Sequence, residues 1–160
     1  MKIEAIKIDM PEGSNMILGQ THFIKSLEDL YEILATSMPR SRFGVAFCEA
    51  SGPCLIRVEG NDQEMKDAAT AIARGVASGH FFSIVLQDAF PINVLNAVKA
   101  CPEVCNIFCA TANPVEVVVA ETEQGRGVMG VIDGYPPKGI EGTAEVEARK
   151  EFLRKIGYKR

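Results

Sequence analysis

Residues 104–134 constrain the fold more than any other part of the chain. They contain three apolar, β-branched runs, each closed by a polar or glycine-rich connection, at 104–109, 115–120 and 128–132. The runs are too continuous for half-solvated strands, so they predict the buried centre of a sheet covered by helices. The two connections, ATANP and ETEQGRG, are rich in small polar residues and glycine. We expect them to contact any small molecule that the protein binds.

The rest of the chain alternates between strand and helix patterns. Strands are predicted over 2–9, 15–19, 43–50, 54–58 and 81–86, and helices from about 23, 61 and 91 and over 143–156. Ser26 and Asp29 are placed to cap the first helix, and Asn61 with Glu64 has the spacing of a capping box for the second. No linker divides the 160 residues. The sequence therefore predicts a single α/β domain, residues 1–160, with helices on both faces of a mixed sheet.

Composition excludes some partners. A net charge of −4 and a pI near 5.3 argue against nucleic acid, which requires a basic face, but not against a nucleotide. Charges at Lys2, Glu4, Lys7 and Asp9 interrupt any signal peptide, and no apolar run is long enough to span a membrane. We therefore expect a cytoplasmic protein without a membrane partner. The odd number of cysteines, with no C-x-x-C motif and no nearby histidine, predicts reduced thiols and no metal site.

The string from Gly125 to Gly130 matches G-x-G-x-x-G in its letters. A dinucleotide-binding turn would need a helix directly after the glycines, whereas β-forming residues follow here. A hairpin fits better, with Gly125 and Gly127 allowing close approach of a ligand to the backbone. Arg126 at its tip is either an exposed cation or a bidentate phosphate clamp.

Other polar residues also have two interpretations. Thr111 and Asn113 leave a buried strand, where binding groups are common, but Asn113 equally suits the turn before a proline. Asn93 and Asn96 share one helix face and could bond a ligand or a neighbouring loop. His80 is either a base or a satisfied, capping histidine.

Three acids have a similar ambiguity. Glu49, Asp62 and Asp133 stand near expected strand or helix ends, where each could hold Mg²⁺ beside a phosphate or simply lie in a solvated turn. The sequence lacks a G-x-S-x-G elbow, a Walker A loop and a protein-kinase signature. Known scaffolds for nucleophilic catalysis or phosphoryl transfer are therefore absent.

Five strings together resemble one family. They are GVAFCEASG (44–52), VEGND (58–62), FPINVLNAVK (90–99), the long string from EVCNIFCATANP to GVIDG (103–134), and RKIGYK (154–159). Their order and length resemble the adenosine-specific kinases of archaea and bacteria, over essentially the whole chain.

The resemblance implies a compact three-layer α/β/α sandwich that forms homo-oligomers, binds adenine nucleotides such as AMP, and transfers phosphate to adenosine, with Mg²⁺ accompanying ATP. Asp133 or Asp62 would then be catalytic, by holding Mg²⁺ or accepting the ribose hydroxyl proton. The candidate nucleotide-binding residues are Arg126, Gly125, Gly127, Thr111, Asn113, Asn93, Asn96, Arg57 and His80. Two alternatives stay open: a non-catalytic nucleotide sensor, and an oligomeric interaction protein.

Overall fold

The computed structural model describes residues 1–158; Lys159, which ends the RKIGYK string, and Arg160 lie outside them. The described chain forms, in order, β1 (Lys2–Ile8), β2 (Asn15–Thr21), α1 (Ser26–Ser37), β3 (Arg42–Cys48), β4 (Ile56–Gly60), α2 (Gln63–Val76), β5 (Phe81–Gln87), α3 (Pro91–Ala100), β6 (Val104–Thr111), β7 (Val115–Glu121), β8 (Arg126–Asp133) and α4 (Thr143–Lys155). The expected strands and helices therefore form, with boundaries shifted by a few residues.

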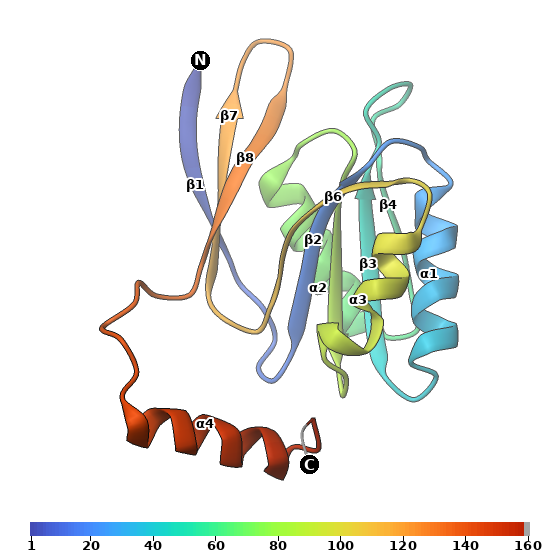
Figure 1. Cartoon of the computed structure of the whole chain (residues 1–160). Coiled ribbons are helices and arrows are strands. Elements are labelled where there is room, and N and C mark those ends of the chain that lie inside the picture. The colour runs from blue at the N-terminus through green and yellow to red at the C-terminus, as the bar shows by residue number, and fades with distance from the viewer. Residues whose placement is uncertain (159–160) are drawn as a thin grey trace.

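The strands lie in two sheets, ordered β4-β3-β5-β2-β6 and β1-β7-β8 (Figure 1). The α/β class is confirmed, but the mixed sheet was wrong, because every ladder between these strands is antiparallel. The helical connections explain the difference. Helix α1 joins the parallel strands β2 and β3, but β5 lies between them and runs the other way. Helices α2 and α3 likewise each join two strands that have one other strand between them in the sheet.

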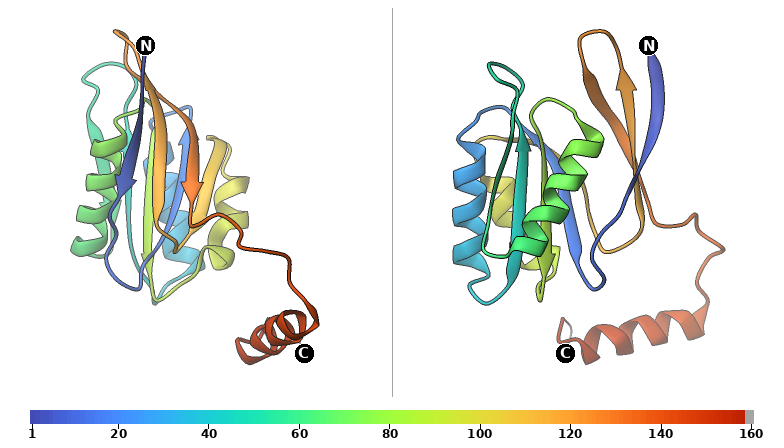
Figure 2. Two further views of the ribbon diagram at one scale, coloured as in Figure 1. Left: turned by 90° about the vertical axis from the view of Figure 1, so that its left-hand side faces the viewer. Right: turned by 180° about the vertical axis from the view of Figure 1, so that it is seen from behind.

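The molecule has three layers (Figures 1 and 2). Helices α1 and α3 pack on one face of the five-stranded sheet, through a core that includes Leu30, Phe43, Phe82 and Val98. Helix α2 and the three-stranded sheet cover the other face together, through a second core that includes Met65 and Val117. The strands of the five-stranded sheet are therefore covered on both sides.

The buried centre is not the stretch 104–134. Strands β2, β3 and β5 are buried almost throughout, whereas β6 and β8 are edge strands, of which β6 is only partly buried and β8 has no buried residue. Strand β7 alternates, with Val115, Val117 and Val119 buried against the core. This expectation was wrong because a continuous apolar run does not distinguish a central strand from an edge strand whose outer face is apolar as well.

The helix caps also differ from expectation. Asp62 caps α2, because its carboxylate accepts the Met65 N–H at 3.1 Å. Asn61 instead binds the backbone of β3, accepting the Phe43 N–H at 2.8 Å. At α1 neither Ser26 nor Asp29 caps the helix, since the Ser26 hydroxyl donates to the Phe23 carbonyl. Capping is decided here by the direction in which the chain enters the helix.

Helix α4 stands apart from the layers at the end of an extended connection (Figure 1). It was predicted as an amphipathic helix, yet none of its residues is buried. Among all described helices, none combines the length and the apolar character that crossing a membrane would require.

Candidate functional site

Two neighbouring cavities lie at one end of the fold. The first, called here the aromatic pocket, has a volume of about 440 Å³ and is lined by His22, Phe23, Ile24, Phe47, Glu49, Ala50, Ser51, Gly52, Pro53 and His80. The second, called the hairpin pocket, has a volume of about 550 Å³ and is lined by Glu49, Ala50, Cys54, Ala77, Gly79, Ala120, Thr122, Gln124, Gly125, Arg126 and Gly127. Both volumes are in the range of small-molecule sites.

The two pockets meet at Glu49 and Ala50, which line both of them. This end of the fold gathers the last residues of β2 and β3, the start of β5, the end of α2 and the tip of the β7–β8 hairpin. Because neighbouring strands are antiparallel, the end of one strand lies beside the start of the next, and this brings these segments together. The two pockets therefore adjoin each other and together form the candidate site.

Rings form part of the aromatic pocket. His80 stacks on Phe47 with ring centroids 6.0 Å apart and planes 18° from parallel. On another segment that lines the pocket, His22 and Phe23 stack on each other, with ring centroids 6.5 Å apart. Both residues of this second pair are exposed. Phe47 is buried beneath His80, whereas the rings of His80, His22 and Phe23 are partly or largely exposed and are suited to stack on a planar heterocycle.

The loop that joins the two pockets is fixed by Glu49. One carboxylate oxygen accepts the Leu55 N–H at 2.9 Å, and the other accepts the Arg57 Nε–H at 2.8 Å. The hydrogen bond from the Leu55 N–H first, and then Arg57, hold the pKa of Glu49 below its ordinary value, although burial acts in the opposite direction. Glu49 is thus a charged anchor for residues 50–54, and Arg57 belongs to this anchor.

Backbone strain is concentrated around these pockets. The described residues other than glycine with left-handed φ are Cys54, Ala77, His80 and Asp88. Cys54 and Ala77 line the hairpin pocket and His80 lines the aromatic pocket. His80 is held at φ +62° by hydrogen bonds from its N–H to the Cys48 carbonyl and from the Thr21 N–H to its own carbonyl. Such strain often marks functional sites.

Arg126 lies in the hairpin pocket with its guanidinium oriented by three elements. It bonds Glu121, the Gly75 carbonyl at 3.2 Å and Glu4 at 3.3 Å. A guanidinium has five N–H donors, and two of those of Arg126 have no hydrogen-bond partner among residues 1–158, so they can bond an anion. Adding a Cβ to Gly125 or Gly127 would meet nothing within 4 Å, so their backbone is open to approach.

Thr111, Asn113 and Asp133 lie at the opposite end of the fold. Asp133 accepts hydrogen bonds from the Thr111 hydroxyl at 2.9 Å and from the Asn113 amide at 3.1 Å. In the β7–β8 ladder Val115 pairs with Asp133 and Glu121 pairs with Arg126, six residues along the strand. At about 3.3 Å per residue, Asn113 and the hairpin tip are roughly 20 Å apart. Within one chain the two connections therefore do not share a cleft, because they flank the same strand.

The other candidates also lie away from the two pockets. Asp62 caps α2 and receives the Arg42 Nε–H at 2.8 Å. Arg42 first, and then the Met65 N–H, hold the pKa of Asp62 below its ordinary value. The Asn93 side chain accepts the Phe90 N–H at 2.9 Å and so caps α3, and Asn96 is exposed one turn later. Hence the structure brings Gly125, Arg126, Gly127, Arg57 and His80 together, but not Asp62, Asn93, Asn96, Thr111, Asn113 or Asp133.

Sequence reasoning did not identify the contributions of Phe47, Phe23, Cys54 and Ala77. Phe47 lay within an ordinary apolar strand, and no sequence pattern predicts that an alanine adopts a left-handed backbone conformation. Residues 51–53 were treated only as the connection between the strands expected over 43–50 and 54–58, although a turn between Glu49 and Arg57 was a usable signal.

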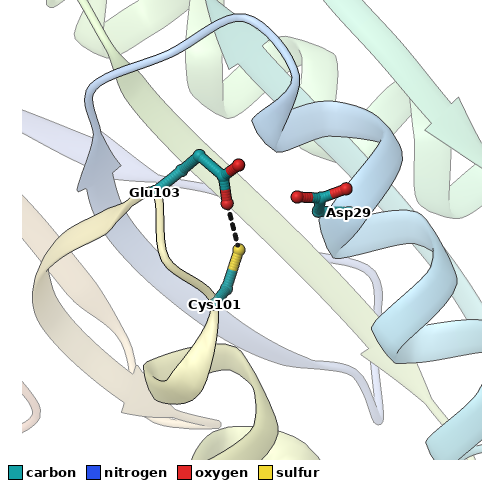
Figure 3. A group of neighbouring side chains, drawn as sticks. All are labelled: Asp29, Cys101 and Glu103. Carbon is teal, nitrogen blue, oxygen red and sulfur yellow. Dashed lines mark hydrogen bonds between the residues drawn. The ribbon is translucent and has the colours of Figure 1, made fainter.

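A third group of polar side chains lies near the start of α1. Asp29, Cys101 and Glu103 bring potential metal ligands within 4.8 Å of one another (Figure 3). The Lys25 ammonium already pairs with both carboxylates. Burial, followed by Glu103, raises the pKa of the Cys101 thiol to about 11, so the sulfur stays protonated. This group is an ion-pair network in which Glu103 is buried and the Lys25 side chain is about half exposed.

We predict that Glu103→Gln lowers the free energy of unfolding at pH 7 by about 1–3 kcal/mol, since a charged hydrogen-bonding partner is lost. The Cys101 thiol and Lys25 lower the pKa of Glu103 to about 2 in the folded chain. The stabilisation is thus complete above the ordinary pKa near 4.5 and is lost as the pH falls towards 2. Urea titrations of both proteins from pH 7 to pH 2 should converge. A difference that does not depend on pH would contradict this role.

The chain is similar to known proteins over nearly its whole length. The sequence model of a family described as adenosine specific kinase matches residues 6–159. Among solved structures, the chain is similar to the PH1918 protein from Pyrococcus horikoshii OT3, with 44% sequence identity and a TM-score of 0.95 over 99% of this chain and 98% of that chain. The search of curated proteins found no match.

Proposed function

Since the chain belongs to the adenosine specific kinase family, we propose that it binds adenine nucleosides and nucleotides across the aromatic and hairpin pockets. The adenine ring stacks in the aromatic pocket, the ribose lies at the junction of the pockets, and the phosphates enter the hairpin pocket. The main observation in support of this proposal is the junction between the two pockets. A pocket with stacked rings adjoins, at Glu49 and Ala50, a second pocket with an arginine and open glycine backbone.

The charge balance in the hairpin pocket supports a role for Mg²⁺. Arg126 lines this pocket and pairs with Glu121 and Glu4, and Glu4 also pairs with Lys2, so these four groups carry no net positive charge. A polyphosphate without a cation would meet two carboxylates. Mg²⁺ retains several waters and takes phosphate oxygens with one or two carboxylates, so it would enter with ATP. Glu49, which lines the pocket, and Glu121, which is paired with Arg126, are carboxylates that could hold it.

Phosphate transfer to adenosine is the activity that the family name describes. In the proposed kinase reaction these residues position the two substrates and offset phosphate charge, with little covalent work. Asp133 and Asp62, expected as catalytic from the sequence, are at the far end from the pockets and take no part in this arrangement.

Binding without transfer is the second candidate function. It is favoured by the state of the acids near the pockets, because Glu49 and Glu121 are both bonded to arginines and Glu49 has a lowered pKa. A carboxylate held in this way is a weak general base. A nucleotide sensor would need the same pockets but no such base.

Calorimetric titration with adenosine, AMP and MgATP tests binding, and guanosine serves as the control ligand. Binding of the adenine compounds alone is the expected result, and no heat with any of them would refute the proposal. Phosphate transfer from γ-labelled ATP to adenosine then separates the kinase from the sensor.

We predict that Arg126→Ala weakens AMP binding by about 1.5–3 kcal/mol, or roughly 10- to 150-fold in Kd, because a charged hydrogen bond to the phosphate is lost. Adenosine affinity should change little, since it has no phosphate. Titrations of both ligands, with the melting temperature as a folding check, measure this. An equal loss for both ligands would mean that Arg126 only holds the hairpin in place.

A further inference from the structure

One short segment of the chain contributes to both pockets. Residues 77–80 join the end of α2 to the start of β5. Ala77 and Gly79 line the hairpin pocket, whereas His80 lines the aromatic pocket. Ser78 lies between them in the chain, and its side chain is buried outside both linings. The Ser78 hydroxyl therefore acts on another part of the structure.

Ser78 attaches this segment to the tip of the β7–β8 hairpin. Its hydroxyl donates to the Arg126 carbonyl at 3.0 Å, and the backbones of the two residues form a parallel β-bridge. The Arg126 side chain contacts the same region, since its guanidinium donates to the Gly75 carbonyl at 3.2 Å. Arg126 begins β8 in the three-stranded sheet, whereas Ser78 precedes β5 in the five-stranded sheet. The contact therefore joins the two sheets beside the hairpin pocket.

The segment that contains Ser78 is fixed at both of its ends. The Ala77 N–H donates to the Ala73 carbonyl and ends α2. At the other end the His80 N–H donates to the Cys48 carbonyl of β3. Ala77 and His80 both have left-handed φ, a strained conformation that persists only where the surrounding structure imposes it. The segment is thus a rigid support, and Ser78 attaches the hairpin to it.

We propose that Ser78 is a positioning residue that fixes Arg126 at the distance from His80 that a nucleoside 5′-phosphate spans. This inference rests on the proposed function, in which adenine stacks beside His80 and the phosphate meets Arg126. Base and phosphate are covalently joined in AMP, so both contribute fully to binding only when their two protein partners are held in register. Adenosine has no phosphate and makes no such demand. Ser78 therefore increases the preference of the site for phosphorylated over unphosphorylated nucleosides.

Calorimetric titration of the full chain with AMP and with adenosine tests the proposal. Ser78→Ala removes the hydroxyl and keeps the backbone bridge, so AMP affinity should fall by roughly 2- to 10-fold, the effect of one hydrogen bond. Adenosine affinity should not change. Ser83→Ala is the matched control, because the buried Ser83 hydroxyl also donates to a backbone carbonyl, that of Ala69 at 2.8 Å. This control should bind both ligands as the wild type does.

A double-variant cycle with Arg126→Ala distinguishes positioning from a general loosening of the fold. Without the guanidinium, Ser78 has no phosphate partner to position, so adding Ser78→Ala should cost less AMP affinity than it does in the wild-type background. An equal loss in both backgrounds, equal losses for AMP and adenosine, or wild-type AMP affinity in Ser78→Ala would each overturn the proposal. A wild type that does not bind AMP would refute the proposed function and this inference together.

Discussion

Gly44→Ala is expected to destabilise the fold by about 3 kcal/mol and to lower the melting temperature by roughly 6–12 °C. Gly44 lies in β3, where α2 crosses the sheet closely. A Cβ at this position would be 2.3 Å from the backbone carbon and oxygen of Met65 and 2.4 Å from the Lys66 nitrogen. Backbone atoms cannot move aside as a flexible side chain can, so the helix would have to shift from the sheet.

Gly130→Ala is the matched control for this effect. Gly130 is also in a strand, but a Cβ there would have nothing within 4 Å. Thermal unfolding of both variants should show a large loss for Gly44→Ala and a change within about 0.5 kcal/mol for Gly130→Ala. Equal effects would mean that α2 and β3 do not approach as closely as described.

His80→Asn is expected to weaken adenosine and AMP binding by about 5- to 150-fold, because stacking of a base on a ring contributes about 1–3 kcal/mol. Asparagine tolerates the left-handed backbone that His80 adopts, so the fold should remain. The variant removes the ring that stacks on Phe47 and leaves the wall of the aromatic pocket incomplete.

Asp88→Asn is a close control, since Asp88 is also at φ +62° but at the other end of β5. Calorimetric titration should give wild-type affinity for this variant. If His80→Asn binds as tightly as Asp88→Asn does, adenine does not stack in the aromatic pocket.

The sequence predicted the elements of the fold better than their arrangement. Periodicity located β5, α2 and the β3–β4 hairpin, because those patterns are local. The placement of β5 between β2 and β3 depends on packing between distant segments, and no local pattern contains it. The expected mixed sheet failed for this reason.

The candidate site shows the same limit. The hairpin at Gly125–Gly127 was predicted in place of a dinucleotide turn, and the structure confirms this. Within one chain, the connections that contain Asn113 and Arg126 do not contact the same small molecule, contrary to the expectation. Their connections flank β7, and in antiparallel strands successive connections lie at opposite ends. Recognition of the antiparallel order would have separated them from sequence alone. The family resemblance, by contrast, is confirmed over nearly the whole chain.

Hydrogen exchange with and without AMP tests the central claim most directly, because it locates the ligand at one end of the fold. Binding across the two pockets predicts slower amide exchange in residues 49–55, 77–80 and 122–127, and unchanged exchange in residues 111–114 and 133–134. Protection confined to the Asn113 and Asp133 end, or no protection at saturating AMP, would contradict it.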